Sequence, residues 1–157
     1  MKAIARFALP FVLATGVVTA VSAENDRATD GVIKARQGLM QLYSHNLGLL
    51  GGMAKGAIPY DADSAGAAAS SLAMLSKIDT SRMWAPGSDD MSADGTRALP
   101  DLWDNPEDVA KKAMALSEAA AAMEVAAATS LEALQGAMGP LGGTCGACHK
   151  AYRAPAN

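Results

Sequence analysis

The sequence predicts an all-α protein, an antiparallel four-helix bundle. Helix-favouring residue types dominate the composition, with alanine, leucine, methionine, lysine and glutamate prominent. β-branched residues are scattered, and no stretch alternates apolar and polar residues for long, so no strand pattern exists. Four amphipathic segments are joined by short first and last connections and a longer central crossover, which is the typical order of a helical bundle.

Residues 1–23 have the pattern of a secretory signal peptide. Lys2 and Arg6 give a positively charged start, an apolar run follows at 7–21, and a Val-Ser-Ala sequence provides an A-x-A-like cleavage site. We therefore expect cleavage after Ala23.

A membrane anchor is the alternative interpretation of this segment. The apolar run has about fifteen residues and contains Pro10, whereas a spanning helix needs about 20. We expect an exported protein whose mature chain, residues 24–157, forms one domain. Cleavage removes two basic residues and no acidic one, so the formal charge of −3 for the full chain becomes about −5. This charge disfavours nucleic acid as a partner, because proteins that bind nucleic acid present a basic face.

The first bundle helix is expected at 30–55, with Gly56 as its stop signal and Pro59 beyond it. Apolar residues at helical spacing around Arg36 form a broad stripe. They are Ile33, Leu39, Met40, Tyr43, Leu47 and Leu50. Arg36 is either a snorkelling side chain at the edge of this stripe or a partner for a buried anion. His45 points about 140° away from Met40 and is expected to face solvent.

The second helix is expected at 62–77, with Asp61 or Asp63 as its N-cap. One face combines Ala65, Ala68, Leu72 and Leu75, and the small alanines allow neighbouring helices to approach closely.

Helical periodicity fails over 79–104, where turn signals follow one another. Loops of this length in a compact domain are usually functional or disordered. Trp84 and Trp103 lie near its two ends, so we expect an ordered, packed crossover.

The third helix has the clearest start, because Asn105 is a typical N-cap and Pro106 suits the first helical position. Its inner face is expected to comprise Val109, Ala113, Leu116, Ala120, Met123 and Ala127. The fourth helix follows a tight turn at 129–130 and runs to about Arg153. Glycines and Pro140 are expected to kink or loosen it near its middle.

Near the end of the fourth helix, residues 145–149 read Cys-Gly-Ala-Cys-His and contain both cysteines of the chain. C-x-x-C-H is the attachment site of c-type haem, where two thiols add to the porphyrin vinyl groups and the imidazole coordinates iron. On a helix, Cys148 and His149 lie about −60° and +40° from Cys145, so all three side chains project from one face.

Other interpretations of this motif have less support. Zinc usually takes four protein ligands, and only His45 would remain as a fourth. A thioredoxin-type dithiol occurs beside a βαβ pattern, which this sequence lacks. A chance match in a helical thiol protein would require both cysteines to fall in the motif.

The sequence resembles cytochrome c′, the class II c-type cytochromes of bacterial periplasms, over nearly the whole mature chain. The resemblance rests on C-x-x-C-H at the C-terminus and on the sequences at 36–40, 96–100 and 150–153. These read Arg-Gln-Gly-Leu-Met, Thr-Arg-Ala-Leu-Pro and Lys-Ala-Tyr-Arg. It implies a four-helix bundle, commonly a homodimer packed through the first two helices, located in the periplasm.

The resemblance also assigns the haem ligands. It implies one haem c bound through thioethers of Cys145 and Cys148, with His149 as the proximal iron ligand. Arg153 matches a basic residue beside the proximal imidazole in relatives that bind gases on that face.

Residues of the first helix and of the crossover are implied to contact the haem from the other side. Arg36 and Gln37 match positions that contact the haem and its propionates, and Thr96, or its neighbour Arg97, matches a crossover position that touches haem. Met40 matches the residue over the distal face. It either blocks that face, leaving a five-coordinate high-spin iron, which we favour, or ligates the iron and makes it low-spin.

Two functions fit this haem: one-electron transfer and binding of small gases such as nitric oxide or carbon monoxide. With Met40 as a ligand, the protein would be purely an electron carrier. A peroxidase or nitric oxide reductase is disfavoured, because cleavage of an O–O bond needs polar acid–base groups over the distal face. The first-helix stripe instead supplies Leu39, Met40 and Tyr43. We therefore expect a carrier and not an enzyme.

Overall fold

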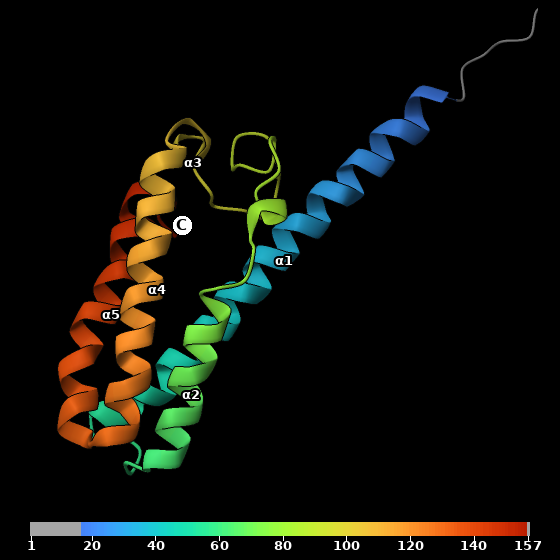
Figure 1. The fold of residues 1–157 in the computed structure, drawn as a ribbon. Coiled ribbons are helices and arrows are strands. Elements are labelled where there is room, and N and C mark those ends of the chain that lie inside the picture. Colours follow the sequence, from blue (N-terminus) through green and yellow to red (C-terminus); the bar gives the residue numbers. More distant parts are fainter. Residues whose placement is uncertain (1–16, 157) are drawn as a thin grey trace, which may run out of the picture.

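A computed structural model describes residues 17–156 of the chain. Four long helices form the bundle (Figure 1): α1 (Val17–Ala54), α2 (Ala62–Leu75), α4 (Pro106–Thr129) and α5 (Leu131–Tyr152). Two short helical segments, η1 (Ser81–Met83) and α3 (Asp101–Asp104), lie in the connection between α2 and α4. Within the described residues there is no strand, so the predicted all-α bundle is confirmed.

The helices pack as two antiparallel pairs. Helix α1 packs against α2, and α4 packs against α5, while α2–α4 and α1–α5 contacts join the pairs. Figure 1 shows that α1 diverges from α4 and α5 toward the end of the bundle where α3 lies. The last turns of α5 lie at this wider end.

Helix α1 is longer than predicted, because it starts at Val17 in the described residues and not near Asp30. No proline or glycine stands between these two residues to stop the helix. Residues 1–16, which hold most of the predicted signal peptide, lie outside the described residues. Among the described helices, none combines the length and the apolar character that a membrane crossing requires.

Side-chain caps begin two of the helices. The Asp61 carboxylate accepts a hydrogen bond of 2.8 Å from the backbone N–H of Ser64, which confirms Asp61 as the cap of α2. The Ser130 hydroxyl accepts one of 3.1 Å from the N–H of Ala133 at the start of α5. Helix α5 then continues through Pro140 without interruption.

Asn105 precedes α4 at the N-cap position, but its side chain makes no capping hydrogen bond. Its amide nitrogen instead donates to the carbonyl oxygen of Asp101 at 2.9 Å. Asn105 therefore occupies the predicted N-cap position without the predicted capping bond, and its side chain is held instead by the short helix α3, which the sequence pattern did not reveal. Pro106 at the first helical position and the acidic first turn are as predicted.

The crossover between α2 and α4 is ordered around its two tryptophans. The rings of Trp84 and Trp103 meet edge to face, with centroids 6.3 Å apart and planes at 71°. The indole N–H of Trp103 also donates to the carbonyl oxygen of Trp84 at 3.0 Å. The predicted packed crossover is confirmed.

The hydrophobic core fills the half of the bundle far from the cysteine motif. It consists of Leu50, Met53, Ala65, Ala68, Ala69, Leu72, Ala73, Ala120, Met123, Ala127, Leu134 and Leu141. On α5 this core ends at Leu141, one turn before Cys145. Small residues allow close packing of α2 against α4. A Cβ added to Gly66 of α2 would lie only 3.3 Å from the Cβ of Ala128 on α4.

Replacing Leu50 by alanine should lower the free energy of unfolding by about 2–5 kcal/mol, because Leu50 is fully buried in this core and a cavity would remain. Val125→Ala on α4 is the control. Val125 is 72% exposed, and its truncation should change stability by about 0.5 kcal/mol or less. Urea unfolding of the haem-loaded protein measures both, and equal effects would contradict this position of the core.

Candidate haem site

The cysteine–histidine motif lies in the last turns of α5, so it is helical as predicted. Cys145, Cys148 and His149 are all half-buried. Tyr43 of α1 lies across from them: burial raises the pKa of Tyr43, and the nearby Cys145 thiol raises it further. The motif therefore faces α1 across the wider end of the bundle.

Several features of the wider end fit a haem between α1 and α5. Met40, which belongs to the apolar stripe of α1, is 39% exposed. Ala113, predicted on the inner face of α4, is also exposed, because no protein side chain covers that face at this level. On α5, a Cβ added to Gly142 or Gly143 would meet no atom within 4 Å. A flat apolar macrocycle attached to the cysteines would supply the missing cover.

The environment of His149 favours the neutral imidazole that binds iron. Burial lowers the pKa of His149, and the positive charges of Arg153 and Arg97 lower it further. Arg153 therefore lies beside the imidazole, where the sequence placed it. In the part of the chain that is described, no three histidine, cysteine or acidic side chains converge to hold a metal ion directly.

The last turn of α5 is tied to the first turns of α4. The Tyr152 hydroxyl donates a hydrogen bond of 2.5 Å to Asp108, and this bond is the main cause that raises the pKa of Tyr152 to about 12. The same bond is the main cause that lowers the pKa of Asp108, and Lys112 forms an ion pair of 3.1 Å with its carboxylate. These contacts hold the motif against α4.

The chain beyond α5 pairs with the crossover. The N–H of Leu99 donates to the carbonyl oxygen of Tyr152 at 3.0 Å, and the N–H of Ala154 donates to the carbonyl oxygen of Arg97 at 2.9 Å. These bonds form an isolated antiparallel bridge between Ala98 and Arg153. The backbone itself thus places Arg97 next to the C-terminal end of the motif.

Arg36 is the most buried charged side chain among the described residues, with 3% of its surface exposed. Its guanidinium donates to the Ser88 hydroxyl at 2.6 Å, to the Ser88 carbonyl oxygen and to the Thr96 hydroxyl at 2.6 Å. It also lies 5.1 Å from the ring centroid of Trp84. Burial lowers the pKa of Arg36, and the charge of Asp89 partly opposes that effect.

Arg36, Gln37 and Thr96 are thus brought together by contacts between α1 and the crossover. The Gln37 amide donates to the carbonyl oxygen of Gly95 at 2.6 Å, beside the bond from Arg36 to Thr96. Ser88 and Thr96 each follow a glycine with positive φ, Gly87 at 78° and Gly95 at 73°. Such turns need glycine and aim the following hydroxyl at Arg36. Haem contacts of Arg36, Gln37 and Thr96 stay predictions.

Replacing Arg36 by methionine should lower the free energy of unfolding by about 2–3 kcal/mol, because buried oxygens of the crossover lose a charged donor. It should also speed hydrogen exchange in residues 83–98. Lys34→Met is the matched control, since Lys34 is exposed on the same helix. Unfolding and hydrogen-exchange mass spectrometry measure both effects. Unchanged exchange in the crossover of Arg36→Met would show that Arg36 does not hold this segment.

Comparisons with known proteins agree with this site. The family model described as Cytochrome C′ matches residues 31–153. Cytochrome c-554 of Cereibacter sphaeroides is 44% identical over 153 residues, which cover 98% of each chain. The solved structure of cytochrome c′ from Rhodobacter Spheriodes is 40% identical, with a TM-score of 0.80, covering 82% of this chain and 98% of that one.

A third relative is a solved cytochrome c′ with an unusual ligand-controlled dimer dissociation. It is 31% identical, has a TM-score of 0.75, and covers 81% of this chain and 97% of its own. The match of the family model to most of the chain, together with the identity over its whole length, settles the relationship: the chain belongs to the cytochrome c′ family, whose members carry covalent haem c.

Proposed function

We propose that this protein is a periplasmic one-electron carrier that also binds small gases at its haem. The observation that carries the proposal is the position of the motif. The core ends at Leu141, and the half-buried Cys145, Cys148 and His149 follow it on α5, facing α1. Haem bound there supplies the ferric–ferrous couple, with a potential set by its ligands and burial. Cleavage after Ala23 and export accord with attachment of haem outside the cytoplasm.

Each protein group has a role at this site. The Cys145 and Cys148 thiols would hold the haem by thioethers, and neutral His149 would coordinate the iron. The bond from Tyr152 to Asp108 fixes the end of α5, and the bonds from Arg36 fix the crossover. The haem would therefore lie between two segments that side-chain hydrogen bonds anchor.

Met40 is proposed to cover the distal face of the haem without binding iron. It is 39% exposed, whereas its neighbour Leu39 is 6% exposed, so Met40 is not filler of the protein core. Its apolar side chain would leave the iron five-coordinate and admit a neutral diatomic gas by moving aside. The relative with ligand-controlled dimer dissociation supports ligand binding in this family.

Ligation of the iron by the Met40 sulfur is the alternative, since thioethers are good haem ligands. The protein would then be an electron carrier that does not bind gas. Both forms are carriers and not enzymes, because Leu39, Met40 and Tyr43 offer little acid–base chemistry over the distal face.

The spectra of the purified protein test this proposal. We expect a high-spin ferric EPR signal and binding of carbon monoxide by the ferrous form. Met40→Leu should keep the high-spin signal, whereas Met40→Ala should speed carbon monoxide binding. Met91→Leu is the control, because Met91 is 83% exposed in the crossover.

Two other spectra would lead to different conclusions. A low-spin spectrum with a sulfur-to-iron charge-transfer band, lost in Met40→Leu, would establish Met40 as a ligand. The absence of a Soret band, in protein produced in a host able to attach haem, would refute the haem proposal.

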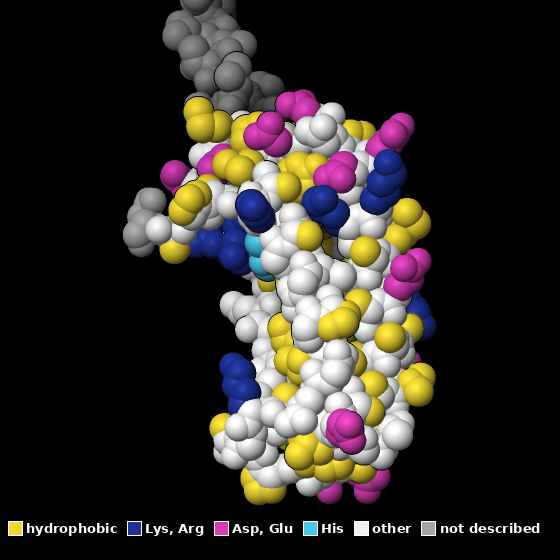
Figure 2. Space-filling model, turned by 90° about the vertical axis from the view of Figure 1, so that its left-hand side faces the viewer, with side chains coloured by type: hydrophobic (Ala, Val, Ile, Leu, Met, Phe, Trp, Pro, Cys, Tyr) yellow, Lys and Arg dark blue, Asp and Glu magenta, His cyan; other side chains and the backbone are white. Residues whose placement is uncertain are grey.

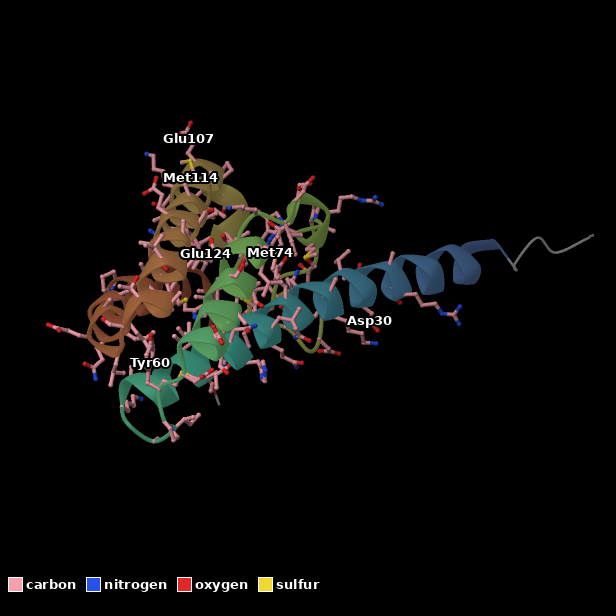
Figure 3. The ribbon with its side chains drawn as sticks, turned by 60° about the horizontal axis from the view of Figure 1, so that its bottom comes forward. Asp30, Tyr60, Met74, Glu107, Met114 and Glu124 are labelled. Carbon is pink, nitrogen blue, oxygen red and sulfur yellow. The ribbon has the colours of Figure 1, made fainter. Side chains whose placement is uncertain are left out.

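We further propose that the protein forms a homodimer through α1 and α2. Large apolar side chains are exposed on both helices, with Leu42 at 51% and Met74 at 62%. Figure 3 labels Met74 on α2. A second subunit that covered these side chains would remove their apolar surface from water, which favours association. The dimer of the relative with ligand-controlled dissociation gives independent support.

Charge placed in this interface should dissociate the dimer. Leu42→Glu combined with Met74→Glu should convert a dimer of the haem-loaded protein into a monomer in sedimentation velocity, because each buried charge lacks a partner. Val125→Glu on α4, where Val125 is 72% exposed, should leave the dimer intact. If only Val125→Glu dissociates the dimer, the interface lies on α4.

A further inference from the structure

A cleft of about 490 Å³ opens beside His149 at the C-terminal end of α5. Its lining combines the end of α5, the crossover and the residues that follow α5. They are Arg97, Gly146, His149, Lys150, Arg153, Ala154, Pro155 and Ala156. Lys150 and Arg153 are exposed, and Arg97 is half-buried. The cleft thus lies on the surface, next to the residue that would hold the iron.

The charge of this cleft is opposite to that of the whole chain. Arg97, Lys150 and Arg153 line it, and no acidic side chain is among its lining residues within 17–156, although the formal charge of the chain is −3. Over the described residues, the ion pair between Lys112 and Asp108 is the single one, so the three cations of the cleft have no acidic partner within 4 Å. Figure 2 shows basic side chains gathered beside a histidine in the upper half of the face that it presents.

Backbone hydrogen bonds bring the segments that carry Arg97 and Arg153 together. The N–H of Ala154 bonds to the carbonyl oxygen of Arg97, and the N–H of Arg153 bonds to that of His149, at 2.9 and 3.1 Å. The acidic residues Asp30, Glu107 and Glu124 in Figure 3 are not among the lining residues. A negative surface approaching this end of α5 therefore meets three positive side chains that extend from neighbouring backbone segments.

We propose that this cleft is the docking surface for an electron-transfer protein whose own surface is acidic around its redox centre. The inference rests on the proposed function of a one-electron carrier. A partner seated here contacts the face of α5 that bears His149, which gives a short path to the iron. One electron passes between the partner's redox centre and the iron, and no bond forms or breaks.

An acidic protein suits the cleft better than a small anion does. A small anion is held tightly where several buried donors converge, whereas Lys150 and Arg153 are exposed side chains on the rim. Charges spread over an open rim act by steering a broad, oppositely charged surface, and they raise the rate of association more than the affinity.

Stopped-flow reduction of the ferric, haem-loaded protein by flavodoxin hydroquinone, an acidic one-electron donor, tests this inference. The second-order rate constant should fall as salt rises, although both proteins are negative overall. Lys150→Gln should lower it by about threefold at low salt, since one steering charge is lost. Lys55→Gln removes the same charge from the end of α1, far from the cleft, and should change the rate much less. Absorption spectra of each variant confirm an unchanged haem.

Three other outcomes would contradict the docking cleft, the class of its partner or the electron-carrier function. A rate that rises with salt and is equal in Lys150→Gln and Lys55→Gln would show that net charge governs the encounter, against a docking cleft. A Lys150 effect seen with dithionite, a small anionic reductant, but not with flavodoxin would indicate a small-anion site instead. A protein with a normal haem spectrum that no donor reduces would refute the electron-carrier function itself.

Discussion

The structure depends on a core that side chains fill over only part of its length. The four helices pack closely where Leu50, Met123 and Leu134 are fully buried, and the packing ends at Leu141 on α5. Beyond it, α1 and α5 face each other with Met40 exposed and the cysteines half-buried. A bundle with this arrangement completes its hydrophobic core only when a large apolar group is attached at the motif. The haem of this family is therefore part of the fold as well as its functional centre.

Burial of Arg36 sets the second constraint, because a buried guanidinium needs acceptors for its donors. The crossover supplies them: Ser88 and Thr96 bond to it, and Trp84 covers it. The crossover has little regular structure of its own, so this cation organises it. With Arg36 held there, the wider end of the bundle has a fixed wall opposite the motif. Arg36 therefore bonds to neutral oxygens of the crossover and lies near the charge of Asp89, while its contact with a haem propionate stays a prediction.

Local signals in the sequence predicted most of the fold. The caps, the helical periodicity and the turn signals located the four helices, and the spacing of Cys145, Cys148 and His149 located the site. Features that depend on distant residues were not predictable. The bond from Tyr152 to Asp108 joins two helices, and Ser88 looks like any turn serine until Arg36 is placed against it. Asn105 shows a related limit, since it stands at the N-cap position but its side chain bonds through its amide nitrogen to Asp101 and makes no capping bond.

The pairing of the crossover with the chain after α5 links the site to its surface. Because Arg97 and Arg153 lie in that pairing, the same two cations act in two directions. Toward the interior, they lower the pKa of His149 and so favour the neutral imidazole. Toward solvent, together with Lys150, they give an acidic chain one positive cleft. A change that neutralised either arginine would therefore alter the electrostatic environment of the iron ligand and the attraction for an acidic partner together. Lys150 is exposed on the rim of the cleft, whereas burial, Arg153 and Arg97 lower the pKa of His149, which is why a change at Lys150 tests the surface role.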